Sequence, residues 1–422
     1  MPSTNVKKRP VWRMKRAWLL LIVVASLALL SSCSGARMLM QTAPSKPKGA
    51  SASPPILAQT VESWEQGKAN LNRTFEREVY GIIPTTFSAE ISDTQQLMSH
   101  PYRADLSEFK ITAYYPVDPD NDAKPTEEKI EYQAVLVLPK NASPSTPIIM
   151  MENFCPNHSV IPDAGVSRPP NITFSCDEDG QMSRFMTYFF GRYIVTPPID
   201  MILDAGYGLA VIYPSPNFPD NAGRFAPIRA AAPNKDEPWG AVGAWAYQFS
   251  TLSNALGTMG YDTTIAYGHS RYGKSALVAA AFDDSIDGVI SHQSGTGGAS
   301  LSRNKKGETV ADITKGYPHW FTPAYSEDSL TIDQHDLLAL IAPRPILLGN
   351  AKRDVWSDPE GAFRAAQGAS PVYRLYGSDG LRQDKLTAFD PSADIAFWMR
   401  RGTHGVVKED WPAFLEFLKA HF

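Results

Sequence analysis

Residues 263–282 read TTIAYGHSRYGKSALVAAAF, and this stretch decides the fold. The run before Gly268 is short and apolar, as in a buried strand, and the Ala-rich run from Lys274 predicts a helix. A serine lifted above a sheet by a sharp strand-to-helix turn is a nucleophile elbow, and glycines beside it avoid a clash of side chains. Here Ser270 has the position of that serine. The usual spacing is G-x-S-x-G, and in this chain the second glycine, Gly273, comes one residue late.

The same turn permits a second interpretation. Residues 268–275 also satisfy G-x-x-x-x-G-K-[ST], the phosphate-binding P-loop, in which Lys274 would bind phosphates and Ser275 a Mg²⁺ ion. The start of the chain favours export to a compartment without ATP, and the loop follows several strands instead of the first. The next predicted strand, Gly288 to His292, ends without an aspartate that could hold the metal. We therefore favour the elbow, and we expect no cofactor and no metal.

Short apolar runs recur along the chain and predict strands that are buried on both faces. The strands are expected at Tyr132 to Leu138, Pro147 to Glu152, Leu209 to Tyr213, Thr263 to Tyr267, Gly288 to His292, Pro345 to Gly349 and Ile395 to Met399, and helices at Trp239 to Leu256, Lys274 to Phe282 and Pro359 to Gln367. This alternation indicates a mostly parallel, doubly wound sheet with helices on both faces. Together with the elbow, it predicts the α/β-hydrolase fold class.

A serine nucleophile needs a histidine to take its proton and a carboxylate to orient that histidine. In this fold the three follow in the order Ser, acid, His. Asp354 comes just after the predicted strand Pro345 to Gly349, and His404 comes just after Ile395 to Met399. The carboxyl ends of parallel strands form the edge where such sheets build their sites. Of the eight histidines only His404 has this place, so we predict a Ser270–His404–Asp354 triad; the alternative is a surface histidine.

The first residues indicate export. Residues 1–32 combine a basic start with thirteen mostly apolar residues and a small-residue cleavage site, which predicts a lipoprotein-type signal peptide. Cys33 would then be the lipidated first residue of the mature chain; the alternative is ordinary cleavage that leaves it free. Residues 33–58 are rich in Ser, Pro, Ala, Lys and Gly and predict a disordered tether. Residues 59–422 would form one catalytic domain.

Composition limits the partners. Removal of the signal's six basic residues leaves 34 Lys and Arg against 44 Asp and Glu, a net charge of −10. The chain has no basic stripe, so nucleic acid is not an expected partner, and a membrane is expected only through the lipid anchor. The protein is expected to be exported, anchored to the bacterial cell envelope or periplasmic, and monomeric. Cys155 and Cys176 could pair in an oxidising compartment or remain two buried thiols, and the sequence leaves both open.

Several blocks of sequence, in order, resemble one family. They are Gly268-x-Ser270-Arg271-x-Gly273-Lys274, Ser294-Gly295-Thr296-Gly297-Gly298-Ala299, Gly307-Glu308-Thr309, Tyr317-Pro318-His319-Trp320-Phe321, Asp333 through Pro345, and Asp354-Val355-Trp356-Ser357-Asp358-Pro359. This pattern is similar to that of the glucuronoyl esterases, carbohydrate esterase family 15. The resemblance runs from about Val79 to the C-terminus and is densest after residue 260.

The resemblance implies an activity and a set of site residues. The family hydrolyses the ester between lignin alcohols and the 4-O-methyl-glucuronic acid groups of glucuronoxylan. Carried over, Arg271 would stabilise the oxyanion through its backbone N–H and its guanidinium. Lys274, Glu308 and Trp356 would hold the hydroxyls and ring oxygens of the sugar. Without the family pattern, Glu308 would read as an ordinary loop acid and Trp356 as a core residue.

The chain departs from the family pattern at two places. Many members carry a catalytic glutamate directly before the Ser-Gly-x-Gly-Gly block, where this chain has Gln293. An amide cannot stabilise an imidazolium by charge, so the acid is assigned to Asp354, with Asp358 as the reserve candidate. Gln293 becomes a hydrogen-bonding bystander. The second departure is Glu152-Asn153-Phe154-Cys155-Pro156-Asn157, which would be the oxyanion loop and could alter the pocket.

We therefore predict a serine carboxylesterase that acts on 4-O-methyl-glucuronate esters of glucuronoxylan through an acyl-enzyme. An acetyl esterase that acts on xylan or another polysaccharide is the first alternative, because the same triad serves any ester. A non-catalytic glycan-binding lipoprotein is the second.

Overall fold

The computed structural model describes residues 53–85, 87–99, 102–117, 126–169, 176, 181–232 and 237–422. The predicted signal peptide, Cys33 and most of the predicted tether lie outside these residues. In the described part of the chain, no helix is both long enough and apolar enough to cross a membrane.

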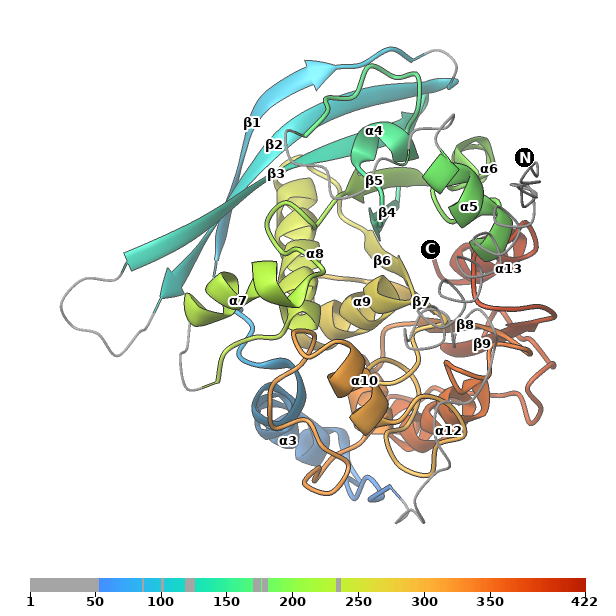
Figure 1. Cartoon of the computed structure of the whole chain (residues 1–422). Helices are drawn as coiled ribbons and strands as arrows, with labels where there is room; N and C mark the ends of the chain where they lie inside the picture. Colours follow the sequence, from blue (N-terminus) through green and yellow to red (C-terminus); the bar gives the residue numbers. More distant parts are fainter. Residues whose placement is uncertain are drawn as a thin grey trace, which may run out of the picture.

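The centre of the molecule is a nine-stranded sheet in the order β1-β2-β3-β5-β4-β6-β7-β8-β9 (Figure 1). The strands are β1 (Ser88–Gln96), β2 (Ala104–Val117), β3 (Thr126–Pro139), β4 (Ile148–Glu152), β5 (Gly208–Ile212), β6 (Thr264–His269), β7 (Gly288–His292), β8 (Ile346–Ala351) and β9 (Ile395–Arg400). The first three pair antiparallel, as does β3 with β5, and every later pairing is parallel. The predicted α/β-hydrolase class is confirmed.

Helices cover both faces of the sheet. They are α3 (Val61–Phe75), the π-helix η1 (Glu76–Tyr80), α4 (Asn157–Val160), α5 (Gln181–Phe190), α6 (Ile199–Asp204), α7 (Ala222–Ala230), α8 (Ala241–Thr258), α9 (Arg271–Phe282), α10 (Val310–Gly316), α11 (Gln334–Leu340), α12 (Pro359–Leu375) and α13 (Asp410–His421). Because successive strand residues point to opposite faces, neighbours along β4 enter different cores. Ile148 and Met150 join the core beneath α8 and α9, whereas Ile149 and Met151 join the core beneath α6 and α13.

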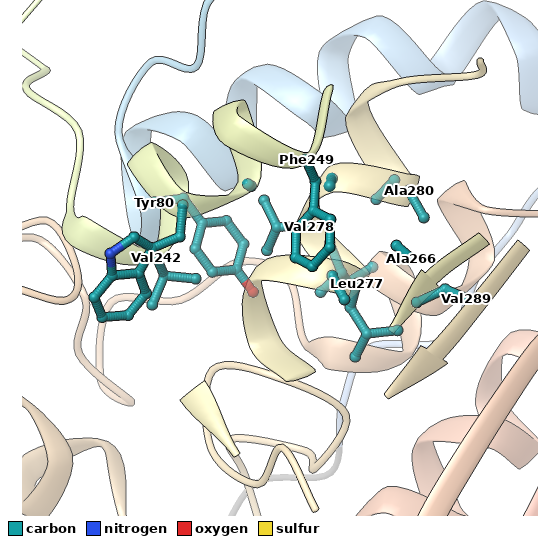
Figure 2. Packing of buried hydrophobic residues seen from close by; sticks show 14 of the residues in the cluster. Tyr80, Val242, Phe249, Ala266, Leu277, Val278, Ala280 and Val289 are labelled. Atoms are coloured by element: carbon teal, nitrogen blue, oxygen red, sulfur yellow. The ribbon is translucent and has the colours of Figure 1, made fainter. Parts of the chain in front are cut away.

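The core on the α8 and α9 side holds the elbow in place. Figure 2 shows Val242 and Phe249 of α8 packed with Leu277 and Val278 of α9, against Ala266 of β6. All five side chains are fully buried. The helix that begins at the elbow is therefore pressed between a long neighbouring helix and the sheet, and the turn that carries Ser270 has little freedom to move.

Every predicted strand and helix is present, with ends that differ by a few residues except at the C-terminal end of α12 and the N-terminal end of β3. The antiparallel strands β1 and β2 were not predicted from the sequence. β1 exposes most of its side chains, and so it lacks the continuous apolar run that marked the other strands.

The predicted tether ends earlier than residue 58. Ser53 donates a hydrogen bond to Asp333 (Oγ to Oδ2, 2.6 Å), and His335 lies 2.8 Å from the carbonyl oxygen of Pro54. Ile56 and Ala58 pack against the core. The assignment of residues 53–58 to a disordered tether is therefore wrong, because its few apolar side chains find a place on the domain that composition alone does not reveal.

Candidate active site

Ser270 lies at the turn between β6 and α9 with backbone angles φ 59° and ψ −120°. A side chain disfavours positive φ, and such strain is typical of functional turns. A Cβ on Gly268 would lie 1.9 Å from the carbonyl oxygen of Tyr272, so only glycine fits there. At Gly273 a Cβ would lie 2.9 Å from the carbonyl oxygen of Gly268. In this turn residue 273 is therefore the one whose side chain would approach the backbone of Gly268. This explains why the second glycine stands at 273 and not at 272.

His404 and Asp354 meet at the carboxyl ends of β9 and β8. His404 Nδ1 lies 2.8 Å from Asp354 Oδ2, and both side chains are buried. The ring of His269, next to Ser270 in the sequence, lies 4.6 Å from the ring of His404. In the described part of the chain, no hydrogen bond joins the Ser270 hydroxyl to His404; in structures without substrate such catalytic bonds are often long.

Gln293 holds the backbone on both sides of His404. Its Oε1 accepts a hydrogen bond from the Gly405 N–H (2.8 Å), and its Nε2 donates to the carbonyl of Thr403 (3.2 Å). His269 Nε2 lies 3.1 Å from the same Oε1. Burial lowers the pKa of His269 well below its ordinary value, and the neighbouring charge of His404 adds to this. Gln293 is thus a backbone anchor beside a neutral ring.

A buried ion pair supports the same loop from behind. Arg400 Nε lies 2.8 Å from Asp410 Oδ1, and Arg400 Nη2 donates to the carbonyls of Thr403 (3.0 Å) and Gly405 (2.7 Å). Asp410 also accepts from the Val407 N–H at 2.9 Å. A buried pair of this kind is stable only when its remaining donors and acceptors are satisfied, as they are here. Neither Arg400 nor Asp410 was predicted from the sequence as a site residue.

The guanidinium of Arg271 lies in an aromatic enclosure. It is 5.3 Å from the ring centre of Phe154 and 5.0 Å from that of Trp320, and it forms an ion pair with Asp220. Asp220 Oδ1 also accepts from the Trp320 indole N–H at 2.6 Å. Arg271 is the first residue of α9, where a backbone N–H has no partner within the helix. The arrangement offers that N–H and a cation, held in one orientation, beside Ser270.

Lys274, Glu308 and Trp356 come together near the elbow, and Lys274 Nζ lies 5.7 Å from the ring centre of Trp320, the same ring that Arg271 contacts. Lys274 Nζ donates to the carbonyls of Thr296 (2.7 Å) and Ser294, which uses two of its three donors. Burial lowers the pKa of Lys274, against the opposing effect of the Glu308 charge. Burial likewise raises the pKa of Glu308, while the charge of Lys274 and a hydrogen bond from Trp356 oppose this.

Glu308 retains one unpaired oxygen. All three of these side chains are buried, and Oε1 of Glu308 has no hydrogen-bond partner. A buried acceptor without a partner costs free energy, so its presence at a site needs an explanation such as a ligand donor. The three residues that the sequence assigned to one sugar pocket are therefore neighbours, and one of them has an acceptor to spare.

The structure also decides the contacts of Asp358, of the two cysteines and of Ser275. Asp358, the reserve acid, accepts from the Gly361 N–H at 3.0 Å and caps α12 with φ 49°, so it is a structural residue. Cys155 and Cys176, left open by the sequence, form a disulfide that ties the loop after β4, the predicted oxyanion loop, to the segment before α5. At the end of β4, Glu152 accepts a hydrogen bond from the Ser275 hydroxyl at 2.6 Å, and burial raises the pKa of Glu152 well above its ordinary value. Ser275 therefore donates to a side chain of the protein.

Phe154, Asp220 and Trp320 were not singled out as site residues. Trp320 stands in a block that resembles the family, and its neighbours could have drawn attention to it. Asp220 carries no sequence signal, because only the fold brings it to Arg271. In the described residues, no group of three or more His, Cys, Asp or Glu side chains is arranged to hold a metal ion.

Comparisons with known proteins agree with this geometry. Residues 233–377 match the family model described as "Glucuronyl esterase, fungi". The chain is 36% identical over 320 residues to carbohydrate esterase MZ0003 of an unknown prokaryotic organism, which covers 68% of this chain and 70% of that protein. It is 30% identical over 154 residues to 4-O-methyl-glucuronoyl methylesterase 1 of Wolfiporia cocos (strain MD-104), which covers 32% of this chain and 38% of that protein.

Two solved structures superpose over nearly the whole catalytic domain. A promiscuous CE15 esterase from a marine bacterial metagenome gives a TM-score of 0.72 at 27% identity and covers 89% of this chain and 98% of that one. A glucuronoyl esterase from Solibacter usitatus gives a TM-score of 0.71 at 28% identity and covers 90% and 99%. The similarity therefore extends well beyond the motifs around the elbow.

Proposed function

The chain belongs to the glucuronoyl esterases of carbohydrate esterase family 15 and is a carboxylic ester hydrolase for 4-O-methyl-glucuronic acid esters, and from this premise we propose that Ser270, His404 and Asp354 perform the hydrolysis through an acyl-enzyme. The observation that carries the proposal is the buried 2.8 Å contact between His404 and Asp354 at the edge where the elbow raises Ser270. The ester bond of glucuronoxylan is the proposed target.

In the first step His404 takes the proton of the Ser270 hydroxyl as the oxygen attacks the C6 carbonyl of the glucuronate. The negative charge on the carbonyl oxygen is stabilised by the Arg271 N–H and by the cation of its side chain. A donor of this kind contributes about 3–4 kcal/mol to transition-state stabilisation. The bond from C6 to the alcohol oxygen then breaks, and His404 protonates the departing alcohol. Asp354 keeps Nδ1 protonated and stabilises the imidazolium.

In the second step water attacks the acyl-enzyme. His404 accepts a proton from the water, the bond between C6 and the serine oxygen breaks, and the proton returns to Ser270. The products are the alcohol and free 4-O-methyl-glucuronic acid. No step requires an oxidant or a second substrate besides water.

Lys274, Glu308 and Trp356 are proposed to hold the sugar during both steps. Each hydroxyl of a glucuronate offers a donor, and the unpaired Oε1 of Glu308 is a suitable acceptor. The ammonium of Lys274 has one donor left for a sugar oxygen. The indole of Trp356 offers an apolar surface to the ring. The P-loop interpretation has no comparable support, because Ser275, the residue that would hold Mg²⁺, donates its hydroxyl hydrogen to Glu152 at 2.6 Å.

Export with a lipid on Cys33, and a monomeric state, remain proposals that rest on the sequence. Radiolabelled palmitate should enter the full-length protein in a bacterial host and fail to enter a Cys33→Ala variant. Label that persists in the variant would disprove the anchor. Gel filtration of the chain from residue 53 onward should give the mass of a single chain.

The central test is hydrolysis of benzyl glucuronate and of an acetylated sugar ester, with Ser270→Ala as the control. We expect faster turnover of the glucuronate and no measurable turnover in the variant. Release of acetate alone would favour the acetyl esterase. Turnover that survives in Ser270→Ala would mean that Ser270 is not the nucleophile.

A further inference from the structure

Asp220 connects the guanidinium of Arg271 to the wall of the active site. One carboxylate oxygen, Oδ2, forms the ion pair with Nη1 of Arg271. The other, Oδ1, lies 2.6 Å from the indole nitrogen of Trp320 and 2.9 Å from Nε2 of His319. The side chains of the ion pair are only 24% and 20% exposed, so salt and water screen their attraction less than that of a surface pair. Asp220 therefore holds Arg271 with one oxygen while two rings hold the other.

His319 is a neutral donor to the carboxylate of Asp220. Burial lowers the pKa of His319 to about 4, and the charges of Arg229 and Arg271 add to this effect. At neutral pH the ring therefore carries one proton, and because a carboxylate only accepts hydrogen bonds, that proton lies on Nε2. The indole N–H of Trp320 is also a neutral donor. Two neutral donors hold the carboxylate without competing with Arg271 for its charge.

The segment that carries these two donors, residues 317–321, is itself held by two helices. Arg229, near the end of α7, donates from Nη2 to the carbonyls of His319 and Phe321, at 2.8 Å each. The first two N–H groups of α8 donate to carbonyls of the same segment at 2.8 and 3.2 Å. N–H groups at the start of a helix have no partner within the helix, so these bonds satisfy them. The donors that hold Asp220 are therefore part of a fixed segment.

The ion pair leaves part of the guanidinium for the substrate. Asp220 engages Nη1, and within the described ranges Nε of Arg271 is buried and has no hydrogen-bond partner. Three rings surround the group, those of Phe154, Tyr317 and Trp320, with centres 5.3, 5.8 and 5.0 Å away. A ring attracts the positive charge as a whole. An acceptor bonded to one nitrogen also fixes the rotation of the planar group, and Asp220 supplies that acceptor.

We propose that Asp220 is a positioning residue for the oxyanion cation: it binds Nη1 while His319 and Trp320 hold its other oxygen, and so fixes the orientation in which Arg271 meets the carbonyl oxygen of the substrate. The inference rests on the proposed function, because it concerns the cation assigned there to the oxyanion. A carboxylate near a developing negative charge by itself raises the energy of the transition state. Orientation explains its presence, since a misplacement of about 1 Å can cost on the order of 10²-fold in rate.

The test is a double-mutant cycle on the hydrolysis of benzyl glucuronate by the full chain. Asp220→Asn keeps the size of the side chain and removes its charge, and it should lower kcat about 10- to 100-fold with KM changed less than about threefold. Arg271→Ala should lower kcat about 10²- to 10³-fold. The double variant should match Arg271→Ala within about twofold, because a residue that acts through Arg271 has no effect once that side chain is absent.

Asp287→Asn is the matched control. Asp287 is also a partly buried carboxylate, and it accepts a hydrogen bond from the Thr264 N–H at 2.8 Å, at the opposite end of β6 from Ser270. This variant should change kcat little. A second pair of variants tests the clamp without altering the ion pair. His319→Leu, which loses the donor, should lower kcat about 2- to 10-fold, and His319→Gln, whose amide keeps a donor, should restore most of that loss.

The outcomes separate the proposal from the function on which it rests. An unchanged or raised kcat in Asp220→Asn would overturn the proposal, and so would losses that multiply in the double variant. Equal rates for the two His319 variants would overturn it too, because the donor would then have no role. A wild-type rate in Arg271→Ala, or no turnover by the wild-type enzyme, would instead contradict the proposed function.

Discussion

The ends of β7 and β8 both place a side chain beside His404, and they hold it in different ways. After β8, the carboxylate of Asp354 contacts the imidazole ring itself. After β7, the amide of Gln293 contacts the peptide groups on either side of the histidine. One position supplies charge and the other supplies geometry. The difference shows that the residue after β7 can still hold the backbone around His404 when it is an uncharged amide.

The largest effect is expected from removal of the charge. Asp354→Asn should lower kcat on the order of 10⁴-fold, because an amide favours the wrong tautomer of His404. The measurement is steady-state kinetics with benzyl glucuronate. The matched control is Asp358→Asn, which keeps a side-chain oxygen to cap α12 and should change both stability and kcat little, because Asn and Asp cap helices about equally well. A large loss in Asp358→Asn and a small one in Asp354→Asn would reverse the assignment.

A second experiment tests whether a carboxylate at position 293, after β7, can replace the carboxylate of Asp354. Many family members carry a glutamate where this chain has Gln293. The double variant Asp354→Asn/Gln293→Glu should recover at least about 10-fold in kcat over Asp354→Asn, since a carboxylate beside the loop stabilises the imidazolium. Equal rates in the double and single variants would show that the position after β7 cannot act as the acid in this chain.

A smaller effect is expected from loss of the anchor alone. Gln293→Leu should lower kcat about 10-fold with KM changed little, because the Gly405 N–H loses its partner and the histidine loses its fixed orientation. Buried Gln383 also accepts a backbone N–H, that of Phe397 in β9, and provides the control Gln383→Leu. Both variants should lower the melting temperature. If both lower kcat equally, Gln293 acts through stability and not through position.

The last prediction concerns stability instead of kcat, through the ion pair behind the loop. Burial raises the pKa of Asp410 to about 6, above roughly 3.9 in an unfolded chain. The folded state therefore binds this proton more tightly, so its contribution to the free energy of unfolding is complete below about pH 4. The contribution is lost as pH rises from about 4 to 6, by about 2–3 kcal/mol. Urea unfolding at several pH values should show this loss in the wild type and its absence in Asp410→Asn. Parallel pH curves for the two proteins would contradict the assignment.

Much of the site could be predicted from local patterns. Ser270, Asp354 and His404 each follow a short apolar run, and in a parallel sheet the ends of such runs meet at one edge. The contact between His404 and Asp354 could therefore be predicted from the order of these residues and their places after the strands. Lys274, Glu308 and Trp356 were accessible only through resemblance to a family, because a lone lysine, acid or tryptophan carries no pattern of its own.

Other features depend on contacts between distant segments. Asp220 contacts Arg271 although the two are 51 residues apart in the sequence, and neither local composition nor periodicity marks Asp220. From the sequence, the position of Gly273 one residue beyond the usual spacing weakened the match to the motif. In the structure, residue 273 is the one that lies against the backbone of Gly268, so a glycine is needed there. The disulfide was left open for the same reason, since whether Cys155 and Cys176 pair depends on the path of the chain between them.

The sequence by itself determined the fold class and the order in which the candidate catalytic residues follow one another, because each is encoded by periodicity and spacing within a few neighbouring residues. Only the tertiary structure decided which groups orient them. The anchor at Gln293, the ion pair of Arg400 and Asp410, and the contact of Asp220 with Arg271 all depend on side chains and backbone brought together by the packing of the sheet. Such contacts arise from the whole fold, and no short stretch of sequence contains them.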